Sequence, residues 1–136
     1  MAEQFESLTP DHIEFIEKQY LYFVGSAGAK GKVSVSPKGM DSLRVINPNK
    51  LVWLNLTGSG NETAAHVIEN NRMTIMFCSF EKQPLILRPY VSANIIYPRD
   101  TKKFETYADM LNHQPGTRQF FELKIAINSC LKNSML

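Results

Sequence analysis

The chain has 136 residues, of which 43% are hydrophobic and 21% charged, and its formal net charge is +2. This length and composition predict one globular domain, residues 1–136, and the small scattered charge gives no indication of a nucleic-acid partner or an anionic membrane surface. No apolar run approaches the roughly 20 residues that span a bilayer, and the polar, acidic N-terminal segment does not read as a signal peptide. Cys78 and Cys130 lie far apart and suggest no disulfide framework, so we expect a cytoplasmic protein.

In chain order, the sequence predicts a short helix, four strands, a second helix, two strands, a third helix and a last strand. Thr9 and Pro10 are typical of a helix N-cap and of the first helical residue. Alternation, β-branched and aromatic residues, and turn residues between segments indicate the strands. The predicted strands are 20–27, 32–36, 43–46, 51–56, 72–80, 84–96 and 120–127, and the second and third helices follow residues 59 and 100.

Three of these segments carry features that predict their environment. Residues 72–80 are apolar on both faces, which favours a central strand. Pro89 lacks a backbone N–H, which predicts an edge strand or a bulge. The helix over 100–112 and the last strand each have an apolar stripe, predicted to hold Phe104, Tyr107 and Leu111 in the helix and Phe121, Leu123, Ile125 and Ile127 in the strand.

Strands outnumber helices and do not alternate with them. This order predicts a mainly β fold, an antiparallel barrel of six or seven strands with about three short helices at its ends. The three histidines and two cysteines lack the local spacing of a metal site, and no Ser-His-Asp arrangement is visible. Cys78 is expected to be a core thiol and His66 a solvated or capping residue, so the sequence assigns no metal ligand and no catalytic residue.

The start of the second helix is crowded with small polar residues. Ser59 and Glu62 fit a capping box, which a well-capped helix alone would explain. Gly58 and Gly60 flank the cap, and hydroxyl and amide side chains surround it. Free backbone N–H groups, glycines and side-chain donors together suit a phosphate or a carboxylate, so the sequence leaves two readings open, a plain cap and an anion site. The polar residues are Thr57, Ser59, Asn61 and Thr63.

The segment 33–39, "VSVSPKG", suggests a second polar site. In an alternating strand, Val33 and Val35 face one way and Ser34 and Ser36 the other. The serine face would then contact a hydrogen-bonding partner, and Lys38 would project a cation from the end of the strand. A solvated strand face with an exposed lysine is the simpler alternative. Arg118, before the last strand, is a further candidate cation with the same alternative.

Three blocks, "GKVSVSPKG", "LVWLNLTGSGNETAAHVIENNRMTIMFCSF" and "PGTRQFFELKIAINSC", resemble the pyridoxamine 5′-phosphate oxidase-related family of FMN-binding split-barrel proteins. The similarity covers nearly the whole chain in the expected order. The resemblance implies an antiparallel split barrel that forms a homodimer and binds FMN in a cleft at the subunit interface. By position, it implies Val35 and Ser36 near the flavin ring and Lys38 at the site. It also implies a phosphate and ribityl region formed by Thr57, Gly58, Ser59, Asn61 and Thr63.

The sequence also departs from the family pattern. Thr63 and Ala64 stand where authentic pyridoxamine phosphate oxidases carry an Arg-Lys pair, and the family's C-terminal Arg- and Pro-containing motif is absent. We therefore do not expect oxidation of pyridoxamine phosphate. The expectation is an FMN-binding oxidoreductase acting on another small substrate. The alternatives are a non-catalytic carrier of flavin, haem or deazaflavin with the same fold, and an interaction subunit without a ligand.

Overall fold

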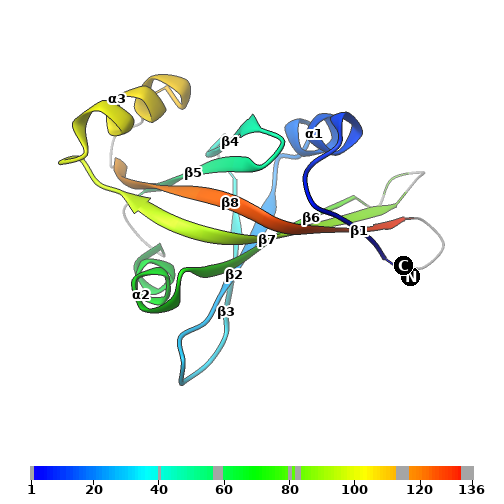
Figure 1. The fold of residues 1–136 in the computed structure, drawn as a ribbon, viewed down its shortest axis with the longest axis horizontal. Coiled ribbons are helices and arrows are strands. Elements are labelled where there is room, and N and C mark those ends of the chain that lie inside the picture. Colours follow the sequence, from blue (N-terminus) through cyan, green and yellow to red (C-terminus); the bar gives the residue numbers. More distant parts are fainter. Residues whose placement is uncertain are drawn as a thin grey trace.

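The protein is described by a computed structural model that covers residues 2–39, 41–56, 60–79, 81, 84–112 and 117–132. The elements in chain order are β1 (Glu3–Phe5), α1 (Pro10–Glu17), β2 (Tyr22–Ser26), β3 (Ser34–Lys38), β4 (Leu43–Asn47), β5 (Lys50–Leu56), α2 (Gly60–Asn70), β6 (Arg72–Ser79), β7 (Leu85–Ile96), α3 (Thr101–Met110) and β8 (Thr117–Lys132). Within the described residues these make eight strands of one sheet and three helices (Figure 1). The mainly β fold with three helices is as predicted, and β1 is an additional strand, too short to show a pattern.

The sheet is antiparallel throughout, and its strand order leaves one seam open. The order is β3-β2-β6-β7-β8-β5-β4, with β1 paired to β8. Strands β3 and β4 therefore end the order, and side chains rather than a strand ladder join the two ends. The Lys38 Nζ atom lies 5.2 Å from the centre of the Trp53 ring, and the Tyr22 hydroxyl lies 2.6 Å from Ser42 Oγ. The first contact brings β3 against β5 across the seam, and the second joins β2 to the residue before β4.

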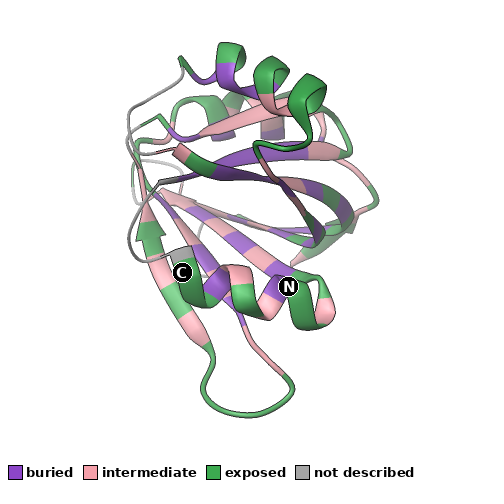
Figure 2. Cartoon of the chain, turned by 90° about the vertical axis from the view of Figure 1, so that its left-hand side faces the viewer, coloured by how far each residue is buried: buried purple, intermediate pink, exposed green. Residues whose placement is uncertain are grey.

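Two apolar clusters pack on the two faces of the strongly twisted sheet. Figure 2 shows buried residues concentrated along the strands, while much of the helices is exposed. The larger fills the barrel, where the fully buried Trp53 and Phe121 rings stack with their centres 4.6 Å apart. The smaller lies under α3, where Tyr107 and Leu111 pack with Phe120 of β8. The predicted stripe of α3 is confirmed, since Phe104 also packs against this smaller cluster. Removal of these large side chains from water is the main stabilisation of the fold.

A buried histidine fixes the N-terminal segment to the sheet. Thr9 caps α1 and Pro10 opens it, as predicted. The Nδ1 atom of His12 accepts a hydrogen bond from the Thr9 backbone N–H at 3.1 Å and lies 3.0 Å from Asn128 Nδ2 on β8. Two donors at Nδ1 require the neutral ring with its proton on Nε2. Burial, followed by the nearby Lys132 charge, lowers the pKa of His12 and favours this form.

One β-bulge in the pairing of β7 with β8 bears on two of the sequence predictions. Pro89 lies in β7, which is not an edge strand, and a bulge follows it at Tyr90/Val91 in the pairing with β8. In that pairing Val91 is opposite Ile125 and Tyr90 is opposite Ile127, so Ala126 is the extra residue. The bulge reverses the alternation of β8. Ile127 is therefore 43% exposed, and its predicted place on the buried side was wrong.

Candidate functional site

Strand β3 has its polar side chains on the interior face of the barrel. Its residues lie opposite those of β2, and residues that are directly opposite share a face. On β2, Tyr22, Val24 and Ser26 are buried. The residues opposite them are Lys38, Ser36 and Ser34 in that order. The predicted alternation of the strand is confirmed, with the serine row on the inner face.

The outer face of β3 is apolar. Val33, just before the strand, is 69% exposed and Val35 is 65% exposed. An ordinary half-buried strand has the opposite arrangement, with its valines inside. Val35 therefore does not lie beside Ser36 and Lys38 in the barrel, and instead lines a groove on the outer surface. The strand thus separates the predicted ring-contacting residues onto two faces.

Ser36 and Lys38 present two desolvated polar groups to the interior. The Ser36 Oγ atom is buried, and no group of the described residues hydrogen-bonds to it. The Lys38 ammonium lies over the Trp53 ring, and burial lowers its pKa. A buried hydroxyl without a partner costs about 1–3 kcal/mol, which is a reason to expect a polar ligand beside it.

The second group of predicted residues lies at the start of α2. Asn61 is exposed in the first turn, and Thr63 is buried. Thr57, Gly58 and Ser59, predicted for the phosphate region, lie outside the described residues. Strand β5 connects the two groups, because it carries Trp53 under Lys38 and runs toward α2.

Arg118 brings a positive charge to this end of α2. Strand β8 begins at Thr117 and pairs with the end of β5, where Gln119 is opposite Asn55. Arg118, the residue before Gln119, donates a hydrogen bond from its Nη1 to Asn61 Oδ1. The sequence identified Arg118 only as a candidate cation, because its proximity to Asn61 depends on the β5–β8 pairing. The exposed guanidinium lies beside the helix N-terminus, where an anion is favoured.

The far end of α2 holds the β2–β3 hairpin. His66 Nδ1 lies 2.9 Å from Ser26 Oγ, Asn70 Nδ2 donates to the Ala27 carbonyl at 2.7 Å, and Glu69 accepts from the Ala29 N–H at 2.8 Å. His66 is thus a half-buried structural link between α2 and β2. Asn71 follows the last residue of the helix with a φ of 61°, in the left-handed conformation that commonly ends helices.

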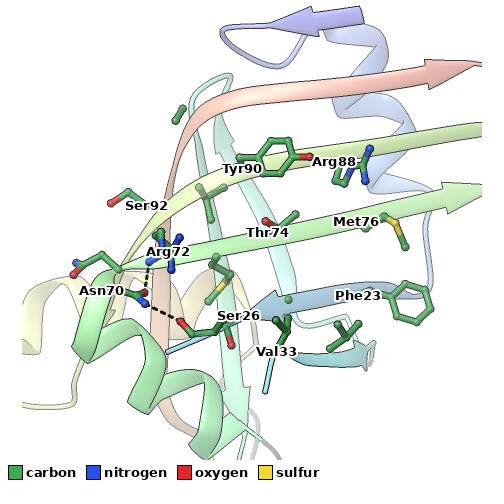
Figure 3. Close-up of a pocket in the computed structure, with 17 residues that line it drawn as sticks. Phe23, Ser26, Val33, Asn70, Arg72, Thr74, Met76, Arg88, Tyr90 and Ser92 are labelled. Atoms are coloured by element: carbon green, nitrogen blue, oxygen red, sulfur yellow. Dashed lines mark hydrogen bonds between the residues drawn. The ribbon is translucent and has the colours of Figure 1, made fainter. Parts of the chain in front are cut away.

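A groove of about 660 Å³ lies on the outer face, beside this end of α2 (Figure 3). It was not predicted, because its walls come from segments distant in sequence. Among the described residues, no three His, Cys, Asp or Glu side chains gather as a metal site. No helix in the described part of the chain has the length and apolar character to cross a membrane.

Sequence similarity to one curated protein shows the family of the chain. A pyridoxamine 5′-phosphate oxidase family protein of Aspergillus flavus is 40% identical over 101 residues, which are 72% of this chain and 41% of that protein. The chain belongs to the pyridoxamine 5′-phosphate oxidase family. The matched segment spans less than half the length of that family protein. No protein-family model matches the chain.

Solved structures show that the chain has the fold of this family. A variant of HupZ from Group A Streptococcus superposes with a TM-score of 0.73 and 19% identity, covering 93% of this chain and 99% of that one. An FMN-binding protein from Syntrophomonas wolfei gives a TM-score of 0.67 and 14% identity, over 90% and 82% of the two chains. HutZ, a haem storage protein from Vibrio cholerae, gives 0.56 and 17%, over 87% and 89%. The split-barrel prediction is confirmed.

Proposed function

We propose that the chain binds FMN and acts as an oxidoreductase on a small substrate. The observation that carries this proposal is Arg118, which β8 places against Asn61 in the first turn of α2. The resemblance assigns the phosphate to this turn. Because Thr63 and Ala64 replace the Arg-Lys pair of authentic oxidases, a phosphate here needs another cation. Arg118 is that cation, and a guanidinium binds phosphate through paired, charge-assisted hydrogen bonds.

We assign the remainder of the cofactor to Ser36 and Lys38 of β3, the residues that the resemblance places near the flavin ring. The buried Ser36 hydroxyl has no partner among the described residues, and a heteroaromatic ring would supply one. The Lys38 ammonium, held over Trp53, is placed to offset negative charge on a ring or on an acidic substrate. Bound FMN supplies the redox chemistry, while these side chains bind the ring, orient it and exclude water.

FMN binding is tested with the visible spectrum of the freshly purified protein and a titration with FMN. We expect flavin absorbance bands or, for ligand-free protein, a Kd well below millimolar. A Kd weaker than millimolar would remove the basis of the proposal. The matched segment covers only 41% of the relative, so the substrate has to be sought by assay of this chain.

The carrier function is the second candidate, and the missing Arg-Lys pair favours it. HutZ shows that a protein of this fold serves haem storage. Stopped-flow mixing of FMN-loaded protein with NADH and NADPH separates the two candidates. Rapid bleaching of the flavin band supports the oxidoreductase. Bound flavin that neither donor reduces supports the carrier.

We further propose that the chain is a cytoplasmic homodimer with the cofactor site at the interface. The exposed Val33 and Val35 support this, because valines are seldom left in water on a strand whose serines face inward. Sedimentation equilibrium across a range of protein concentrations tests the dimer. A monomer at all concentrations would contradict it.

A further inference from the structure

The carboxylate of Glu122 on β8 is the centre of a polar cluster that the proposed function does not use. Its side chain is only 11% exposed. Tyr107 of α3 donates a hydrogen bond to Oε2, and the Nζ atom of Lys103, in the same helix, lies 3.5 Å from that oxygen. The Nζ atom of Lys50, in β5, lies 3.7 Å from Oε1. One carboxylate therefore joins three elements of the chain.

The negative charge of Glu122 offsets the charges of lysines from different elements. Lys50 also lies directly opposite Lys124 in the pairing of β5 with β8, and like charges in that position are destabilising. Burial alone would raise the pKa of Glu122, but the Tyr107 hydrogen bond and the charges of Lys50 and Lys103 lower it. Glu122 is therefore ionised at neutral pH. Loss of its charge would leave Lys103 of α3 facing Lys50 uncompensated, which would weaken the contact of α3 with the sheet.

Helix α3 also contacts β8 through apolar side chains. The Phe120 ring is fully buried, and its centre lies 5.0 Å from that of Phe104 and 5.9 Å from that of Tyr107. Phe120 and Glu122 share one face of β8, because successive side chains of a strand alternate between faces. Figure 1 shows α3 over the end of the sheet where β8 begins. The helix thus fixes the first part of β8 through one apolar and one polar contact.

Arg118 lies at an irregular point of β8, just before the residues that α3 contacts. In the pairing with β5, Thr117 is opposite Leu56 and Gln119 is opposite Asn55, so Arg118 is the extra residue of a bulge. A bulge interrupts the ladder and redirects the side chain of the extra residue. The direction of Arg118 therefore depends on how firmly the neighbouring residues of β8 are held.

We propose that Glu122 is a positioning residue for Arg118 and acts through α3. This inference rests on the proposed binding of the FMN phosphate by Arg118. With Glu122 ionised, α3 holds the start of β8, and the guanidinium stays beside Asn61 at the first turn of α2. Without that charge, α3 and the start of β8 are held less firmly, and the guanidinium is less well pre-organised for the phosphate. The flavin ring, assigned to β3, keeps its contacts.

Fluorescence titrations with FMN and with riboflavin at pH 7 test the proposal, because riboflavin lacks the phosphate. Glu122→Gln should raise the Kd for FMN roughly three- to tenfold and leave the Kd for riboflavin unchanged. Tyr107→Phe removes only the hydroxyl and keeps the ring on Phe120, so it should act in the same direction. The controls are Glu105→Gln, which neutralises an exposed carboxylate of α3, and Arg99→Met, which removes an exposed arginine near α3. Both should match the wild type.

Hydrogen exchange of the flavin-free protein tests the same contact without a ligand. We expect the amides of residues 101–110 and 117–120 to exchange faster in Glu122→Gln than in the wild type or in Glu105→Gln. Unchanged exchange in these residues would overturn the inference. So would an equal rise of both Kd values in Glu122→Gln, which would indicate a general structural role.

The two measurements also separate this inference from the proposed function. A wild type that binds FMN and riboflavin equally overturns the phosphate assignment, whatever the exchange shows. A wild type that prefers FMN, together with a Glu122→Gln variant that keeps this preference, overturns only the role of Glu122. Thermal unfolding verifies that each variant is folded. If Glu122→Gln does not fold, Tyr107→Phe decides the result by the same two measurements.

Discussion

Strands β3 and β8 place their polar and apolar side chains in opposite ways. In β8, Phe121 and Leu123 fill the barrel, while Lys124 is exposed. In β3, Ser36 and Lys38 face the interior, while Val35 lies in water. Strand β8 follows the pattern that stabilises a core, and β3 departs from it. A strand that departs from the stabilising pattern next to an open seam is where we expect ligand binding rather than packing to have determined the residues.

The largest effect is expected at Trp53 of β5, whose ring contacts both β3 and β8. Its ring stacks on Phe121 of β8 and lies under Lys38 of β3. Trp53→Ala should lower the free energy of unfolding by about 3–5 kcal/mol, because it opens a cavity in the core. Urea denaturation measures the change. Trp53→Phe, which keeps an aromatic ring, is the control and should lose clearly less, and a loss below about 1 kcal/mol in the alanine variant would show that the stack is not a core contact.

The contact of His12 with β8 predicts how the free energy of unfolding depends on pH. His12 is held neutral against Asn128, with Lys132 also lowering its pKa and with Asp11 and Glu3 raising it. The pKa in the folded protein is below the ordinary value of 6.5, so the unfolded chain binds more protons. Stability is therefore fully present above pH 6.5 and falls as the pH drops toward the lowered pKa.

Denaturation measured between pH 7 and 5 should show this slope, at most about 1.4 kcal/mol per pH unit for one proton. His12→Gln cannot titrate, and its curve should be flatter by that amount. Identical slopes in both proteins would mean that His12 does not couple to folding.

The smallest effects test the two faces of β3 directly. Ser36→Val removes a buried hydroxyl without a partner, so it should stabilise the ligand-free protein by roughly 1 kcal/mol while weakening FMN binding. Val35→Ser, one position away on the exposed face, should change stability by less than about 0.5 kcal/mol. A destabilised Ser36→Val protein would indicate that the hydroxyl has a structural partner, and that the inner face is part of the core.

Local pattern predicted much of the fold. The N-cap of α1, the apolar stripe of α3 and the alternation of β3 each depend on residues close in sequence, and each is confirmed. Ile127 was misplaced because a bulge depends on how β8 pairs with β7. The residues of the candidate site are likewise brought together by the pairing of strands distant in sequence. Arg118 and Asn61 are 57 residues apart, and only the β5–β8 pairing brings them together.

The most direct test of the central claim, that Arg118 holds the phosphate of FMN, compares FMN with riboflavin, which lacks the phosphate. Fluorescence quenching gives both Kd values for the wild-type chain, Arg118→Met and the control Arg99→Met. We expect the wild type and the control to bind FMN at least about tenfold more tightly than riboflavin, and this preference to disappear in Arg118→Met with riboflavin affinity unchanged. Equal affinity of the wild type for the two flavins, or an FMN preference that survives in Arg118→Met, would contradict the claim.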